Sequence, residues 1–414
     1  MYSSAVLPFQ NELKFDPSLD PSKDDQFFQC VPSRAGVFLI ETRKPGGTTP
    51  SRPYLARTAD LRRTAERLLR SPDPDSKRLN LREVAAEFRY RVTGSRFEQI
   101  LALYEQARTR FPNRYRDFMR LRPPALLKVN LRNPYPRCYV TRRILSDHGF
   151  YVGPFLSRRA AESFSGRFLD LFKIRRCQIK IRRDPNFPGC IYSEMKMCLA
   201  PCFAGCTKEE YDAEVSRVVE TLESQGASLI GSIERERESA SEATDFERAA
   251  SLHKRIEKVS GVFRGLPEII RRVDKLNAVI LQRAAREKTV AVFTIVSGVF
   301  AEPFFLSFDE LSQPQSVEEI LRQQFQELQP DECAAGDEPC DTMSKMTQGA
   351  DASATPSNPP SLNVAAQRGE HLSLLARWFY SKPRTGEILF RDADWPYRRI
   401  LRACARVLAE QKTP

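Results

Sequence analysis

Five of the ten cysteines of this 414-residue chain lie within one thirty-residue segment, as Cys177, Cys190, Cys198, Cys202 and Cys206. Thiolates gathered in one segment are typical of metal sites. The spacings C-x12-C, C-x7-C and C-x3-C include few short pairs, whereas structural zinc sites usually have two such pairs. Irregular loops can supply the thiolates of an iron-sulfur cluster. Spacing alone therefore leaves an iron-sulfur cluster, zinc and buried free thiols open.

The distribution of the cysteines also indicates the cellular compartment. Secreted proteins space their cysteines to form disulfide bonds, whereas the cysteines of this chain are clustered. No apolar leader follows Met1, and no run of 18 apolar residues is present. We therefore expect a cytoplasmic protein with no membrane partner.

The chain carries a formal net charge of +12 and has an isoelectric point near 9.3, which favours a polyanionic partner such as DNA. Much of the excess is local. The first basic cluster consists of Arg108, Arg110, Arg114, Arg116, Arg120 and Arg122. The second, beside the cysteines, consists of Lys173, Arg175, Arg176, Lys180, Arg182 and Arg183. We predict that both clusters contact phosphates of DNA, although solvated faces of a soluble protein would have the same composition.

The elements that position these residues begin with a polar N-terminal arm, residues 1–30, in which three prolines argue against a long helix. Residues 31–120 follow as a small domain. The runs A-G-V-F-L-I-E-T and P-Y-L-A-R-T predict a β-hairpin, and Asp60 can N-cap the next helix. A strand around Phe88 and a helix from Phe97 to Arg110 complete an α/β unit.

The rest of the chain predicts alternating strand and helix units. Residues 121–206 contain two strands around N-P-Y-P, a helix and the cysteine segment. Residues 207–264 open on the capping-box sequence T-K-E-E and predict three helices. Residues 265–328 predict a three-stranded β meander, residues 329–366 a disordered linker, and residues 367–414 a helical tail. The expected fold class is multi-domain α/β.

Five motifs occur in an order that resembles the UvrC excinuclease family of bacterial nucleotide excision repair. They are F-Y-V-G-P-F at Phe150, L-F-K-I-R-R-C at Leu171, C-L-A-P-C-F-A-G-C at Cys198, T-K-E-E-Y at Thr207 and D-F-E-R-A-A-S-L-H-K-R-I at Asp245. The resemblance implies that Cys177, Cys190, Cys198 and Cys202 hold an iron-sulfur cluster, with zinc as the alternative. Cys206 would be an extra thiol.

The segment D-F-E-R-A-A is similar to the family's UVR motif, a helical hairpin that docks on the helicase UvrB. By this resemblance, Phe246, Glu247, Ala249 and Ala250 are the partner-binding residues. The packing of Phe246, Ala249 and Ala250 within the hairpin is a second, compatible role.

Residues 31–120 resemble the family's GIY-YIG nuclease domain, in which a glutamate holds one divalent metal ion beside a tyrosine and an arginine. Tyr54 keeps its motif position, and Arg57 stands at the family's lysine. The first motif tyrosine is replaced by Phe38. Tyr54 and Arg57 are therefore the retained catalytic candidates.

The remaining catalytic positions are substituted. Thr64 replaces the expected arginine, with Arg62 and Arg63 as the nearest substitutes. Leu103 replaces the metal-binding glutamate, and Glu98 is the better substitute among nearby carboxylates. Mg²⁺ or Mn²⁺ is expected only if this site is active, because a divalent ion needs a carboxylate to hold it.

We therefore expect a DNA-binding protein of excision repair that docks on a UvrB-type helicase and has an impaired nuclease centre. One alternative is an active endonuclease that makes a single metal-dependent incision with Glu98 as ligand. The other is a metal-cluster scaffold without a DNA role. Full-length relatives continue into an RNase-H-like nuclease and helix-hairpin-helix elements, which we do not expect in this chain.

Overall fold

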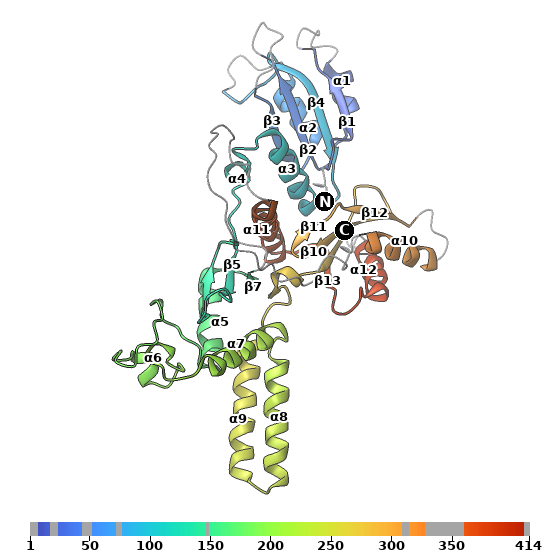
Figure 1. Cartoon of the computed structure of the whole chain (residues 1–414). Helices are drawn as coiled ribbons and strands as arrows, with labels where there is room; N and C mark the ends of the chain where they lie inside the picture. Colours follow the sequence, from blue (N-terminus) through green and yellow to red (C-terminus); the bar gives the residue numbers. More distant parts are fainter. Residues whose placement is uncertain are drawn as a thin grey trace, which may run out of the picture.

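The computed structural model of the chain describes residues 7–16, 24–43, 52–71, 77–145, 149–308, 314–327 and 360–409. These residues form a mixed α/β structure with three antiparallel sheets, from which one long helical hairpin projects (Figure 1). Among the described residues, no helix is both long and apolar enough to cross a membrane.

The N-terminal sheet has the strand order β1-β4-β2-β3. Its strands are β1 (Asn11–Lys14), β2 (Gly36–Thr42), β3 (Tyr54–Thr58) and β4 (Ala85–Val92). Side chains of β2 alternate between two cores, because Val37 and Leu39 join the core of α3 (Arg96–Arg110) while Phe38 joins that of α2 (Leu61–Leu69). The predicted hairpin is confirmed. Asp60 caps α2 by accepting a hydrogen bond from the Arg63 amide at 2.9 Å.

The predicted separate N-terminal arm is wrong for its described residues. β1 is an edge strand paired with β4, and α1 (Asp24–Cys30) buries Phe28 against the sheet. A buried ion pair of 2.7 Å joins Asp24 of α1 to Arg82. Tertiary pairing of short segments, which local propensity does not indicate, incorporates this region into the domain.

The middle sheet has the order β6-β5-β7-β8. Its strands are β5 (Ala125–Val129), β6 (Cys138–Thr141), β7 (Phe150–Phe155) and β8 (Arg271–Arg272). The two predicted strands around N-P-Y-P are confirmed as β5 and β6, whereas β7 and β8 were not predicted. The predicted helix is α5 (Arg158–Leu169), and α4 (Tyr115–Phe118) precedes the sheet. The cysteine segment contains α6 (Ile191–Glu194) and the 3-10 turn η2 (Pro201–Phe203).

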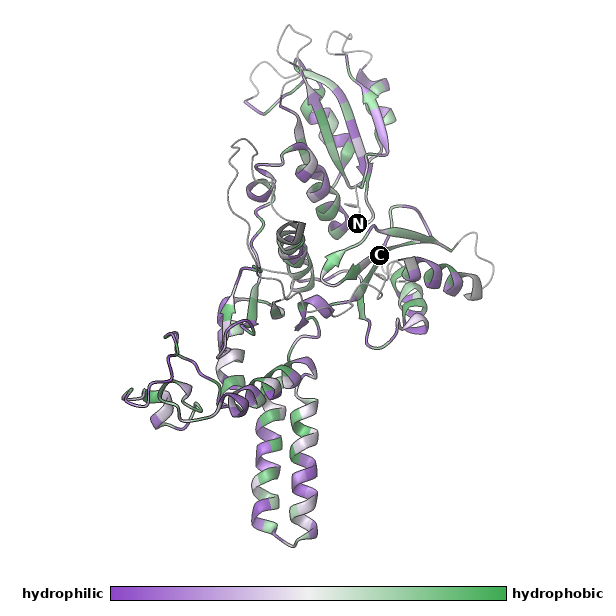
Figure 2. Cartoon of the chain, in the orientation of Figure 1, coloured by the Kyte–Doolittle hydropathy of each residue, from purple (hydrophilic) through white to green (hydrophobic). Residues whose placement is uncertain are grey.

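Three helices follow the cysteines as predicted: α7 (Lys208–Glu223), α8 (Ala227–Glu242) and α9 (Phe246–Phe263). The capping box of α7 is formed, since Thr207 and Glu210 each accept a hydrogen bond from the other's amide. α8 and α9 lie side by side and extend away from the remainder of the molecule (Figure 1). Both are mixed in hydropathy along their length (Figure 2).

The C-terminal sheet has the order β11-β10-β9-β13, with β12 also pairing with β10. Its strands are β9 (Ala278–Arg283), β10 (Thr289–Val296), β11 (Val299–Phe300), β12 (Phe304–Ser307) and β13 (Glu387–Phe390). Ile280 and Phe293 face one core and Val279 and Val292 the other. Burial on both faces explains the continuous apolar runs of β9 and β10. The turn η3 (Val273–Lys275) leads into this sheet.

The predicted helical tail is part of this sheet domain. Its helices are α11 (Pro360–Phe379) and α12 (Tyr397–Ala409), and between them β13 pairs with β9. α10 (Pro314–Glu327) and α12 cover one face of the sheet. Of the predicted linker, residues 329–359 lie outside the described residues, while residues 360–366 are wrong as a linker because they begin α11.

Candidate functional site

Tyr54 lies in a pocket of about 370 Å³ at the outer end of β3, without a neighbouring carboxylate among the described residues that line it. Those lining residues are Thr42, Arg43, Arg52, Pro53, Leu55, Leu81, Val84, Phe111 and Phe118. The Tyr54 ring contacts Phe38 at a centroid distance of 6.0 Å. A phenol in this setting has basic and apolar neighbours, and nothing beside it among the described residues would hold a divalent cation.

Glu98 lies at the opposite end of the same sheet. In the pairing of β2 with β3, Tyr54 lies across from Ile40 and Thr58 lies across from Gly36. Gly36 also pairs with Val92, the last residue of β4, and just beyond it the Gly94 amide donates a hydrogen bond to Glu98 at 2.8 Å. Four residues of strand separate the two ends by roughly 13 Å. Tyr54 and Glu98 therefore do not share a site.

Glu98 is also engaged in the fold. It is 1% exposed and lies 3.7 Å from the guanidinium of Arg91, which is itself buried. Burial raises the pKa of the Glu98 carboxyl, while the Gly94 amide and Arg91 oppose that rise. The carboxylate thus serves the N-terminus of α3 and the Arg91 contact. Leu103, which the resemblance aligns with the metal-binding glutamate, is buried in the apolar core.

The three candidate arginines differ in availability. Arg62 donates to the Val31 carbonyl at 2.7 Å and to the Gln29 carbonyl at 3.3 Å, so it anchors α2. Arg63 is exposed on the same helix. Arg57 is exposed on β3, and the pKa of its guanidinium is lowered by partial burial and by neighbouring Arg96. Only Arg57 and Arg63 of the three remain available to a phosphate.

Neither basic cluster is a uniform phosphate-binding surface. In the first, Arg114 is exposed, Arg110 pairs with Glu41 at 2.9 Å, and Arg116 pairs with Glu370 at 2.7 Å. Arg108 is half-buried, with one guanidinium nitrogen enclosed by protein. Its prediction as a phosphate contact is therefore weakened by burial.

In the second cluster, Lys173 is exposed, whereas Arg176 pairs with Asp170 at 2.9 Å. Arg175 is 3% exposed and donates to the carbonyls of Tyr135 at 2.7 Å and Ile179 at 2.8 Å. This burial argues against the prediction of Arg175 as a DNA contact, because its guanidinium ties the cysteine segment to the middle sheet. Sequence position gave no sign of this burial.

A polar cluster that sequence reasoning missed connects the N-terminal domain to α11. The Glu370 carboxylate accepts hydrogen bonds from the Tyr104 hydroxyl at 2.6 Å, the Tyr115 hydroxyl at 2.7 Å and Arg116 at 2.7 Å. Both tyrosines therefore act as structural donors that hold α3 and α4 against α11. The sequence did not single out Glu370, because its neighbours Arg368 and His371 are polar as well.

The four predicted ligand thiols gather in the cysteine segment without forming a closed metal site. Burial raises the pKa of the Cys198 thiol to about 11, and the thiols of Cys177, Cys202 and Cys190 add to that rise, so these three lie within electrostatic range of Cys198. Across the described ranges, however, no three His, Cys, Asp or Glu side chains are arranged around a common metal position. The donor chemistry of the four thiols fits a thiolate-bound cluster.

Cys206, predicted as the extra thiol, is buried in the apolar core beside the start of α7. Its backbone carbonyl accepts a hydrogen bond from Arg183 at 3.1 Å. Cys206 therefore packs as an apolar side chain.

The far end of the hairpin carries Phe246, the most exposed aromatic residue among the described residues. Phe246 begins α9 and its side chain is 70% exposed. Glu247 and Ala250 are exposed and Ala249 is half-buried, while Leu252 and Val259 further along the helix are buried against α8. Packing holds the hairpin together below this end, so Phe246 is free to meet a partner.

Comparison with known proteins shows what the middle of the chain is similar to. Residues 125–221, from β5 to α7, match the family model "UvrC/Cho excinuclease, middle domain", and residues 227–261, which cover α8 and most of α9, match the model "UvrB/uvrC motif". The middle region of the chain is therefore similar to proteins of the UvrC family. The resemblance expected from the five motifs is thereby confirmed.

Curated relatives show the same similarity. The chain is 27% identical over 244 residues to the UvrABC system protein C of Dehalococcoides mccartyi strain CBDB1, covering 58% of this chain and 40% of that protein. It is 23% identical over 288 residues to the UvrABC system protein C of Clostridium tetani, which covers 68% of this chain and 45% of that protein. It is 34% identical over 131 residues to the UvrABC system protein C of Nitratidesulfovibrio vulgaris, which covers 32% of this chain and 19% of that protein. The chain thus spans less than half the length of these relatives, and no solved structure matches it.

Proposed function

We propose that this chain is a DNA-binding, UvrC-type protein of nucleotide excision repair that docks on a UvrB-type helicase through the α8–α9 hairpin and has an impaired nuclease centre. The observation that carries the proposal is the exposed Phe246 at the end of a hairpin whose residues match the UvrB/uvrC motif. Exposed aromatic side chains with rigid support are common anchors of protein interfaces.

The docking proposal is tested by Phe246→Ala. We expect the variant to bind a UvrB-type helicase at least ~10-fold more weakly in titration calorimetry, because an aromatic anchor contributes roughly 2 kcal/mol or more. Its melting temperature should be unchanged, since the side chain is exposed. Leu156→Ala, which removes another strongly exposed apolar side chain (66%), is the matched control and should bind normally. Equal affinities of Phe246→Ala and Leu156→Ala would overturn the docking role.

The impaired nuclease centre is supported by the separation of Tyr54 from Glu98 and by the buried, apolar Leu103. We expect no nicking of supercoiled plasmid by the purified protein in Mg²⁺ or Mn²⁺. Nicking that is abolished in both Tyr54→Phe and Glu98→Gln would instead establish the single-incision endonuclease.

The same chain would bind DNA through the exposed cations Arg57, Arg63, Arg114 and Lys173. Because binding to phosphates releases counterions, the affinity for duplex DNA should fall steeply with salt. Salt-independent or undetectable binding in an anisotropy titration would favour the scaffold without a DNA role.

We further propose that Cys177, Cys190, Cys198 and Cys202 hold an iron-sulfur cluster, a proposal that their mutual proximity and thiolate chemistry support. Protein purified without oxygen should contain iron and absorb visible light, and Cys198→Ser should lose both. Cys30→Ser, which changes an exposed cysteine in α1, should retain them. Colourless wild-type protein with bound zinc would point to the zinc alternative.

A further inference from the structure

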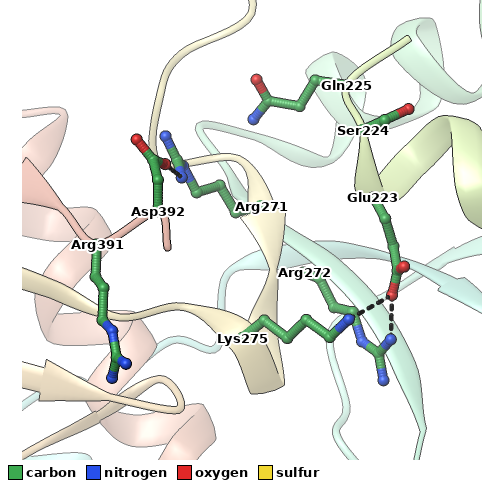
Figure 3. Close-up of a pocket in the computed structure, with 8 residues that line it drawn as sticks. All are labelled: Glu223, Ser224, Gln225, Arg271, Arg272, Lys275, Arg391 and Asp392. Carbon is green, nitrogen blue, oxygen red and sulfur yellow. Dashed lines mark hydrogen bonds and ion pairs between the residues drawn. The ribbon is translucent and has the colours of Figure 1, made fainter. Parts of the chain in front are cut away.

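A polar pocket of about 370 Å³ lies where the base of the hairpin, the middle sheet and the C-terminal sheet meet (Figure 3). It is lined by Glu223, Ser224, Gln225, Arg271, Arg272, Lys275, Arg391 and Asp392. The first three follow one another at the end of α7, the next three belong to β8 and η3, and the last two follow β13. None of these residues belongs to the basic clusters or nuclease candidates considered above.

Cations outnumber carboxylates in this pocket. Glu223 accepts from both Arg272 and Lys275, and Arg271 pairs with Asp392 at 2.9 Å (Figure 3). Arg272 is also held by Asp274, outside the lining, through two contacts of 2.7 Å. With Asp274 counted, four cations still face three carboxylates. Within the described part of the chain, no carboxylate pairs with the Arg391 guanidinium, which in Figure 3 lies across the pocket from Glu223.

Aromatic rings hold the three guanidinium groups in place. Arg271 lies 4.5 Å from the Phe390 ring centroid, Arg272 lies 5.0 Å from that of Phe150, and Arg391 lies 5.8 Å from that of Trp395. Stacking on a ring fixes a guanidinium plane and leaves its edge N–H groups directed outward. The cations are therefore positioned before any ligand arrives, which reduces the entropy lost on binding.

We propose that this pocket, named here the junction pocket, binds a phosphate group of a nucleic-acid backbone. Guanidinium and ammonium groups suit phosphate oxygens, and the volume falls within the roughly 300–1,000 Å³ of small-ligand sites. The backbone assignment rests on the proposed DNA binding, whereas the phosphate chemistry does not. A phosphate here would contact residues from both sheets beside the turn that begins the hairpin, so DNA would be bound at the base of the helicase-docking element.

The test uses the full chain and the double variant Lys275→Gln with Arg391→Gln, which removes the two cations that contribute least to the ion pairs of the fold. The matched control is Arg399→Gln with Arg402→Gln, two exposed arginines of α12, so both proteins lose the same net charge. Melting temperatures check that all three proteins are folded. Anisotropy of a labelled DNA duplex over a salt series measures DNA affinity, and calorimetry with inorganic phosphate measures the pocket alone.

We expect the pocket variant to bind DNA about tenfold more weakly than the wild type. The slope of its log affinity against log salt concentration should be smaller by about one to two, which corresponds to one to two lost phosphate contacts. The DNA affinity of the control should change less than about twofold. Phosphate should bind the wild type and the control but not the pocket variant. If phosphate binding is lost while DNA affinity matches the control, the ligand is a free phosphate compound and the backbone assignment falls.

Phosphate binding by a wild-type protein that does not bind DNA would refute the proposed function and leave the pocket standing. The pocket proposal itself is overturned if the wild type binds no phosphate and the pocket variant binds DNA as the control does.

Discussion

Single residues show how burial redirects charged and polar side chains in this protein. Arg175 and Arg62 look like phosphate contacts by type and position, yet each donates its guanidinium hydrogens to backbone carbonyls. Glu98 looks like a metal ligand, yet it is buried beside Arg91. An enclosed charge needs partners within the protein, because burial without them costs several kcal/mol. The residues that remain available for binding are the exposed ones.

Glu105 provides a prediction at this scale. Burial raises the pKa of its carboxyl to about 7, with neighbouring Arg108 opposing the rise and Glu370 adding to it. The unfolded chain has an ordinary glutamate pKa of about 4.3, so between these values the native state binds more protons than the unfolded state. The free energy of unfolding should therefore fall as the pH rises from about 4 to 7 and stay low above that range.

Glu105→Gln should remove this dependence, because glutamine is neutral at every pH. At pH 8 we expect the variant to be more stable than the wild type by roughly 2–4 kcal/mol in urea denaturation. Burial and the nearby Arg108 lower the pKa of His371 to about 3, so this histidine destabilises both proteins equally below pH 6.5. Its effect therefore cancels in the difference in unfolding free energy between variant and wild type. Stability curves that run parallel from pH 5 to pH 8 would contradict the prediction.

At the scale of the element, the hairpin depends on the turn that joins α7 to α8. Gly226 has φ +95°, and a Cβ at this position would lie 2.6 Å from the Phe263 ring at the end of α9. Left-handed backbone and close approach both require glycine here. The turn therefore fixes where both helices of the hairpin leave the rest of the protein.

Gly226→Ala should destabilise the protein by about 1–3 kcal/mol, since alanine is strained at positive φ and would displace Phe263. Gly231→Ala is the matched control, because that glycine lies within α8 with open space around its Cα. Higher helix propensity should make the control neutral or more stable by up to ~1 kcal/mol. Thermal denaturation measures both, and equal melting temperatures would show that the turn tolerates a side chain.

At the scale of the whole molecule, the predicted units are not independent. The ring centroid of Phe97 in α3 lies 5.1 Å from that of Phe293 in the C-terminal sheet and 5.6 Å from that of Trp378 in α11. One apolar core runs from α3 through the middle sheet to the C-terminal sheet. The N-terminal domain, the middle region and the C-terminal helices are thus packed as one body in which the hairpin is the projecting part (Figure 1).

The sequence by itself determined the elements whose signals are local. Asp60 and Thr207 cap the helices they were expected to cap, and the apolar, β-branched runs around Phe38 and Phe293 form strands. These features depend on hydrogen bonds and periodicity within a few residues, which a linear reading contains. The motifs likewise indicated the similarity to the UvrC family, because they preserve residue types in order.

Only the tertiary structure decided which charges are free and which segments complete a sheet. β1 and β13 acquire strand structure by pairing with distant strands, and Glu370 finds its donors on α3 and α4. The junction pocket joins Arg271 to Asp392, 121 residues away along the chain. Such contacts depend on how apolar faces pack, and packing brings together residues whose spacing in the sequence carries no trace of their proximity.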